Sequence, residues 1–103
     1  MTHSLKIGDI LESSWGYDQT NVDFYKVIGV SPTRVRVVKV KAQSTSGASW
    51  GTGTKVPVPD AQDGDPMWRK VHESGPKQYG VRIASYAWAR LWDGRPANFT
   101  EYA

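Results

Sequence analysis

Apolar and polar residues alternate with a period of two along much of this chain, a pattern typical of strands that cover a core with one face. Short segments rich in Gly, Pro, Ser and Asp, which favour turns, separate these runs. The pattern predicts strands within residues 5–15, 24–30, 34–41, 55–59, 67–73 and 78–84, and an extended segment over 97–103. We therefore expect a mainly β protein with short antiparallel connections.

One of these runs changes phase. Basic residues occupy even positions at Arg34 and Arg36, and odd positions at Lys39 and Lys41. Because side chains alternate strictly along a strand, the two pairs cannot share a face unless the strand is interrupted. The adjacent valines at 37 and 38 predict a bulge or sharp bend there, which would restore one basic face.

Residues 85–94 fit two kinds of structure. Strand alternation would place Tyr86, Trp88, Arg90 and Trp92 on one face. Ser85 is a good helix N-cap and Gly94 a good C-terminal residue, while the intervening Ala, Arg and Leu favour helix. We expect one short helix here. Together, this helix and five to six antiparallel strands predict a small, partly open barrel of the SH3-like or OB-like kind.

Length and composition restrict the function classes. The 103 residues predict one domain over 1–103, which is large enough to fold without disulfides or bound metal ions. Absence of cysteine excludes disulfides, thiol catalysis and cysteine-bound zinc. No secretory signal or membrane-spanning apolar run is visible, and no motif indicates a cofactor or a metal site. We expect a cytoplasmic protein without cofactor, metal or membrane association.

The densest group of hydrogen-bonding side chains lies at residues 17–23, after the first strand. One interpretation is a turn whose side chains bond their own backbone. The other is a loop that binds a protein partner with polar groups between flanking aromatics. The residues predicted to bind are Trp15, Tyr17, Asp18, Gln19, Thr20, Asn21, Asp23 and Tyr25.

The net charge is +3 and it is unevenly distributed. Residues 24–59 contain six basic side chains and no acidic one, whereas residues 60–65 contain three aspartates. The basic segment is either a solvated strand face or a surface for phosphates, with aromatics as stacking platforms for bases. The alternative prediction is thus nucleic-acid binding by Arg34, Arg36, Lys39, Lys41 and Trp50, with Tyr25 or Trp68 as further platforms.

Catalysis has little support in the sequence. Asp18 and Asp23 could serve as an acid pair in a small hydrolase, but nothing indicates that their pKa values are raised. His72 is adjacent to Glu73 in a predicted strand, where neighbours point to opposite faces. Oxygen ligands at 18–23 or at 60–65 match no standard calcium loop. The sequence therefore favours a protein that is not an enzyme.

Two stretches carry a resemblance. SWGYDQTNVDFY at residues 14–25 and LWDGRP at 91–96, followed by Tyr102 and Ala103, resemble small proteins of bacteriophages and mobile elements whose function is unassigned. The resemblance implies a phage-encoded accessory protein in the host bacterial cytoplasm, and it implies that the two stretches pack near each other. The leading hypothesis is binding of a host protein through residues 17–23.

Overall fold

A computed structural model describes residues 5–15, 21–44, 52–75, 78–84, 87–95 and 97–100. These residues form eight antiparallel strands and contain no helix. The strands are β1 (Ile10–Trp15), β2 (Asn21–Val30), β3 (Arg34–Ser44), β4 (Thr52–Gln62), β5 (Met67–Gly75), β6 (Gln78–Ala84), β7 (Ala87–Leu91) and β8 (Ala97–Thr100). The mainly β class is confirmed, with more strands than the pattern predicted.

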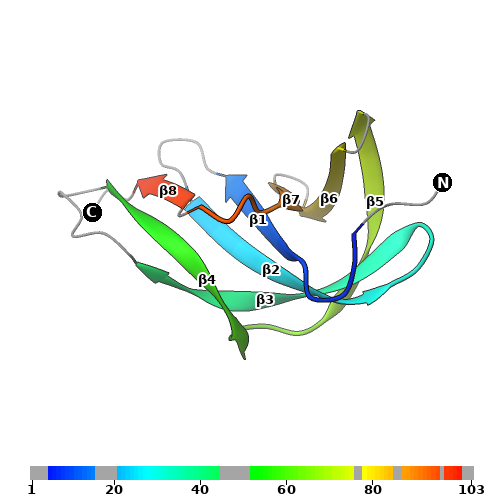
Figure 1. Cartoon of the computed structure of the whole chain (residues 1–103), viewed down its shortest axis with the longest axis horizontal. Coiled ribbons are helices and arrows are strands. Elements are labelled where there is room, and N and C mark those ends of the chain that lie inside the picture. Colours follow the sequence, from blue (N-terminus) through cyan, green and yellow to red (C-terminus); the bar gives the residue numbers. More distant parts are fainter. Residues whose placement is uncertain are drawn as a thin grey trace.

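Six of the strands close into a ring. The order β2-β1-β7-β6-β5-β3 ends on strands that also pair with each other, so each strand has hydrogen-bonded neighbours on both sides. β4 pairs with the second half of β3, and β8 pairs with β4, which extends the sheet away from the ring (Figure 1). The small barrel is therefore confirmed, and its ring is closed instead of partly open.

The helix expected within residues 85–94 is wrong for the described part of this segment. Ala87–Leu91 is strand β7, which pairs with β6 on one side and with β1 on the other. Its alternation decides the matter, because Ala87 and Ala89 are buried while Trp88 and Arg90 are exposed. Gly94, expected at a helix end, instead takes a positive φ of 86° in the turn after β7.

β3 explains the change of phase that the sequence showed. Its outer, even-numbered face carries exposed Arg34 and Arg36 and then buried Val38 and Val40. The odd-numbered face is buried in the barrel at 35 and 37, and reaches the surface again at Lys39 and Lys41. The expected bulge in β3 is wrong, since the extra residue lies on β2 between Val27 and Gly29. The two basic pairs remain on opposite faces.

The interior of the ring holds the main core. It is built from valines and leucines of five strands together with Tyr25, and the preceding Leu5 also belongs to it. Leu11, Val27, Val37 and Val81 are fully buried. Burial of this many aliphatic side chains supplies the main stabilisation of so small a barrel.

A second, smaller core lies outside the ring, under β4 and β8. Val22, Phe24, Val40 and Ala97 are buried there, and Trp92 packs against them. The Phe24 and Trp92 rings meet edge to face with centroids 5.9 Å apart. The expectation that the stretches at 14–25 and 91–96 pack near each other is thus confirmed. β2 and β3 each serve both cores, because each strand presents one face to each.

Candidate nucleic-acid interface

The outer surface of β3, β5, β6 and β7 carries aromatic and basic side chains together. On β5, residues 68, 70 and 72 alternate outward, and their neighbours across the strands are also even-numbered outward positions. We call this surface the aromatic–basic face; it consists of Trp68, Trp88, His72, Arg34, Arg36, Lys70, Arg82 and Arg90. Each of these side chains is exposed.

Trp68 lies across two neighbouring strands. It pairs with Arg36 on β3, which in turn pairs with Gly29 on β2. A Cβ built on Gly29 would meet Cη2 of Trp68 at 3.4 Å and Cβ of Arg36 at 3.2 Å. The six-membered ring of the indole therefore uses the space that this glycine leaves. Even so, 47% of Trp68 is exposed, so the ring is supported from below and open to solvent.

Trp88 repeats this arrangement on the other side of β5. A Cβ on Gly80 would meet Cε3 of Trp88 at 3.3 Å, so the indole lies against β6 at this point. The His72 ring on β5 meets the Trp88 ring edge to face, with centroids 5.0 Å apart and planes at 73°. Trp88 remains 48% exposed. An exposed tryptophan held by neighbours on two strands has little rotamer freedom left to lose when a ligand binds.

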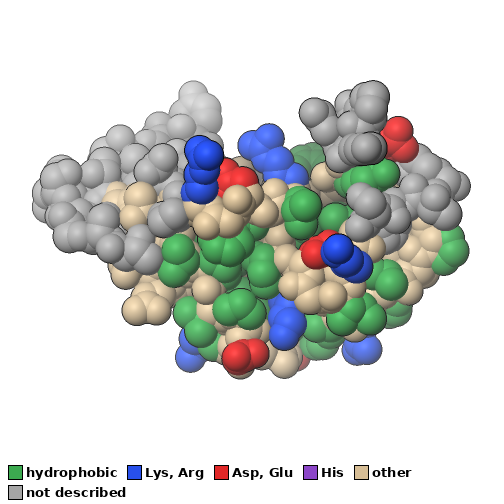
Figure 2. Space-filling view, in the orientation of Figure 1, with side chains coloured by type: hydrophobic (Ala, Val, Ile, Leu, Met, Phe, Trp, Pro, Cys, Tyr) green, Lys and Arg blue, Asp and Glu red, His purple; other side chains and the backbone are tan. Residues whose placement is uncertain are grey.

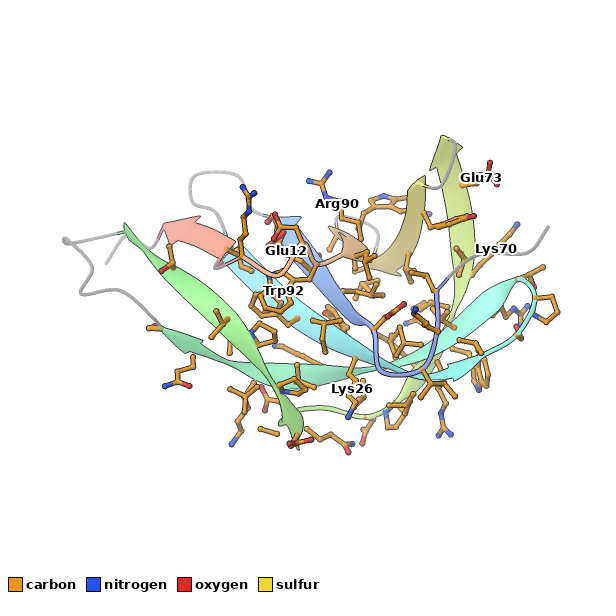
Figure 3. The ribbon with its side chains drawn as sticks, viewed as in Figure 1. Glu12, Lys26, Lys70, Glu73, Arg90 and Trp92 are labelled. Atoms are coloured by element: carbon orange, nitrogen blue, oxygen red, sulfur yellow. The ribbon has the colours of Figure 1, made fainter. Side chains whose placement is uncertain are left out.

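Cations surround both indoles. Arg34 is opposite Lys70, and Arg82 is opposite Trp88. None of the face's arginines or its lysine forms a salt bridge with a described residue. Figure 3 shows Lys70 projecting from β5 and Arg90 from β7. In Figure 2, by contrast, acidic side chains lie beside basic ones in places, so that view shows no purely cationic surface.

Glu12 marks the border of the face. It lies on β1, opposite Arg90 of β7 and Phe24 of β2 (Figure 3). Burial raises the pKa of Glu12, and the negative charge of Asp93 raises it further, while Arg90 lowers it. A carboxylate in this position would repel a polyanion, so the cationic surface ends at Arg90.

The structure divides the basic residues that the sequence grouped together. Arg34 and Arg36 lie on the aromatic–basic face with Trp68. Lys39 is on the opposite side of β3, where its Nζ is 3.5 Å from Oδ1 of Asp23. Lys41 is exposed beyond the ring, where β3 pairs with β4. Trp50 lies outside the described residues.

The predicted protein-binding loop falls largely outside the described residues, which exclude Tyr17, Asp18, Gln19 and Thr20 as well as the side chain of Trp15. Asn21 begins β2, opposite the backbone of Trp15. Asp23 is half-buried and paired with Lys39. Tyr25 is 7% exposed and packs in the main core, which leaves little of its ring for a partner. Host-protein binding by this loop stays a prediction.

The described residues contain no group of three or more His, Asp or Glu side chains placed to hold a metal ion. His72 and Glu73 pair with different residues of β6, Gly80 and Tyr79, on opposite faces. This is the alternation that the sequence predicted for the two residues. Within the same described part, no helix has the length and apolar character needed to span a membrane.

Lys70, Arg82 and Arg90 were assigned to no site from the sequence, and Trp88 was not among the residues predicted to bind nucleic acid. Their signal was present, since strand alternation over 85–92 would have put Trp88 and Arg90 on one face. Because a helix was expected there, these two residues were not grouped on one strand face.

Comparison with protein-family models, with curated proteins and with solved structures found no match. The resemblance to phage proteins therefore stays a prediction.

Proposed function

We propose that this protein binds nucleic acid through the aromatic–basic face of its barrel. The observation that supports this most strongly is the pair of half-exposed indoles, Trp68 and Trp88, each held over a glycine among cations that form no salt bridge with a described residue. Arg and Lys side chains neutralise phosphates, and aromatic faces stack on bases, so the combination suits this ligand class. In a small barrel, interpreted as SH3-like or OB-like, an outer strand surface is a common place for such contacts.

The charge of the whole molecule is consistent with selective binding. A net charge of +3 is modest, so affinity depends on where the cations gather more than on their total. The outward-facing cations of β3, β5, β6 and β7 are concentrated on one part of the barrel. We also propose, following the resemblance, that the protein acts without catalysis in the cytoplasm of a bacterium that carries a phage or mobile element.

The test is fluorescence anisotropy with labelled oligonucleotides at low salt. We expect R34E/R82E to lower affinity by about tenfold or more, since each reversal removes an attractive contact and adds a repulsive one. The control K41E/K55E makes the same change in net charge on the β3–β4 part of the sheet. It should retain most of the affinity. Equal losses in both variants would contradict the proposal, as would absence of binding by the unchanged protein.

A further inference from the structure

We infer that the ligand of the aromatic–basic face is a single strand, with unpaired bases stacked on Trp68 and Trp88. This rests on the proposed function and specifies its substrate class. In a duplex the base faces are already stacked on one another, so an exposed indole gains nothing from them. Unpaired bases have free faces, and stacking one on an aromatic side chain stabilises a complex by about 1–3 kcal/mol.

Trp68 and the His72 ring that Trp88 contacts are far enough apart along β5 to serve separate bases. Trp88 packs against His72, and His72 is four positions along β5 from Trp68. At about 3.3 Å per residue, four positions span about 13 Å. Lys70 lies between them on the same outer face, with Arg34 as its cross-strand neighbour. A strand that places one base on each indole would thus carry its intervening phosphates past two cations.

The shape of the surface also favours a flexible ligand. The face follows four of the six strands in a closed ring, so it is convex and curves around the barrel (Figure 1). Double-stranded DNA has a persistence length of about 150 base pairs and would touch such a surface along only part of its extent. A single strand can bend to follow it.

Acidic residues limit the face at both ends. Beyond Trp68 the chain passes into the segment that joins β4 to β5, where Asp63 and Asp65 are exposed. That segment is fixed beside β3, since the amide of Asp63 donates to the carbonyl of Lys39 at 2.7 Å. Beyond Arg90 lies Glu12. These carboxylates would repel the second backbone of a duplex and restrict the ligand to a short length of single strand.

The glycines make the role of the indoles testable without removing them. An alanine at position 80 would press on Trp88, because its new methyl group would lie 3.3 Å from Cε3 of the indole and the ring would have to shift by a few tenths of an ångström. An alanine at position 29 would meet Trp68 at 3.4 Å, an ordinary van der Waals distance, and its tight contact would be with Cβ of Arg36 at 3.2 Å. Gly80 is therefore a positioning residue for the Trp88 platform, and Gly29 supplies the matched control.

The experiment compares oligonucleotides of about 12 nucleotides, within the range that one such barrel occupies. The probes are labelled oligo-dT, oligo-U and a DNA duplex of the same length. We expect single strands to bind at least about tenfold more tightly than the duplex, and W68A or W88A to remove most of that difference. W68F and W88F should restore it in part, while L91A, which truncates an exposed apolar side chain outside the face, should leave it unchanged.

Circular dichroism and the melting temperature establish that each variant is folded. G80A should weaken single-strand binding by a smaller factor than W88A, without changing duplex binding, and G29A should weaken it less than G80A does. Equal affinity for single strand and duplex would overturn the inference, as would tryptophan variants with unchanged selectivity. If R34E/R82E still abolished binding in that case, the proposed function would stand. Preference for dT over U, or the reverse, would distinguish DNA from RNA as the source of the strand.

Discussion

At the scale of single residues, the buried hydroxyl of Ser13 destabilises the folded state. It is 1% exposed inside the ring, between Asp23 of β2 and Ala89 of β7. No described residue forms a hydrogen bond with its Oγ. A buried hydroxyl without a partner destabilises a protein by about 1–3 kcal/mol relative to one that is satisfied.

We therefore expect S13A to raise the free energy of unfolding by about 1 kcal/mol, because the methyl side chain needs no partner. Urea unfolding followed by fluorescence measures the change. S14A is the matched control at an exposed position of the same strand, and it should stay within about 0.5 kcal/mol of the unchanged protein. A loss of stability in S13A would show that the hydroxyl is satisfied.

Glu12 provides a second test at this scale. Its raised pKa means that the folded state binds its proton more tightly than the unfolded state does. The resulting stability is fully present below the unfolded value of 4.5, and it is lost as the pH rises through the raised pKa. E12Q keeps a neutral side chain at every pH.

We expect E12Q to be more stable than the unchanged protein near neutral pH, and the difference to disappear below pH 4.5. Unfolding free energies measured across this range would show the convergence. A gap that widened as the pH fell would mean that the carboxylate is stabilised in the folded state, contrary to this account.

At the scale of elements, the sequence predicted the individual strands better than it predicted which strands pair and which of their faces are buried. The alternation in β2, β3, β5 and β6 was visible because valines and aromatics recur at every second position. Gly8 and Asp9 are residue types that favour turns, and the structure shows a turn before β1 with reciprocal bonds between Lys6 and Asp9. These signals are local, so no tertiary information was needed.

β3 and β7 show where local signals fail. In β3, Val37 packs in the main core and Val40, on the opposite face, packs in the second core, which only the position of β4 and β8 explains. In β7 the residues have helical propensity, but pairing on both sides overrides it. The aromatic–basic face was hidden for the same reason, because its residues come from four strands and meet only when the ring closes.

The shared strands lead to a prediction about cooperativity. Phe24 is fully buried in the second core, while its neighbour Tyr25 packs in the first. We expect F24A to lower the free energy of unfolding by about 3–5 kcal/mol. Because β2 and β3 belong to both cores, the loss should reach the amides at 34–37 of β3. Hydrogen exchange that lost protection only in β4 and β8 would contradict this coupling.

At the scale of the whole molecule, the two cores and the aromatic–basic face divide the barrel into separate roles. β4 and β8 cover one side of the ring and bury Phe24 and Val40 beneath them, with the half-buried Trp92 packed against these residues. The outer side of β3, β5, β6 and β7 has no such cover among the described strands. It is there that Trp68 and Trp88 remain half exposed.

Salt dependence tests the electrostatic part of this account. If up to five cations of the face each contact a phosphate, the logarithm of affinity for a single strand should fall with the logarithm of salt concentration, with a slope of about −2 to −3.5. Titrations at several salt concentrations measure the slope. Replacing Lys70 by Gln should make it shallower by about 0.7. A slope near zero would mean that phosphates are not the ligand.

The most direct test of the central claim is a nuclear magnetic resonance titration of the labelled protein with a short oligonucleotide. The indole N–H signals of Trp68 and Trp88 report on the face itself, and that of Trp92 reports on the turn where its Nε1 donates to Arg95. We expect the first two to shift together with the amides of β5 and β7, while the Trp92 signal stays in place. Shifts confined to β4 and β8, or no shift at low salt, would contradict the assignment of this face as a nucleic-acid interface.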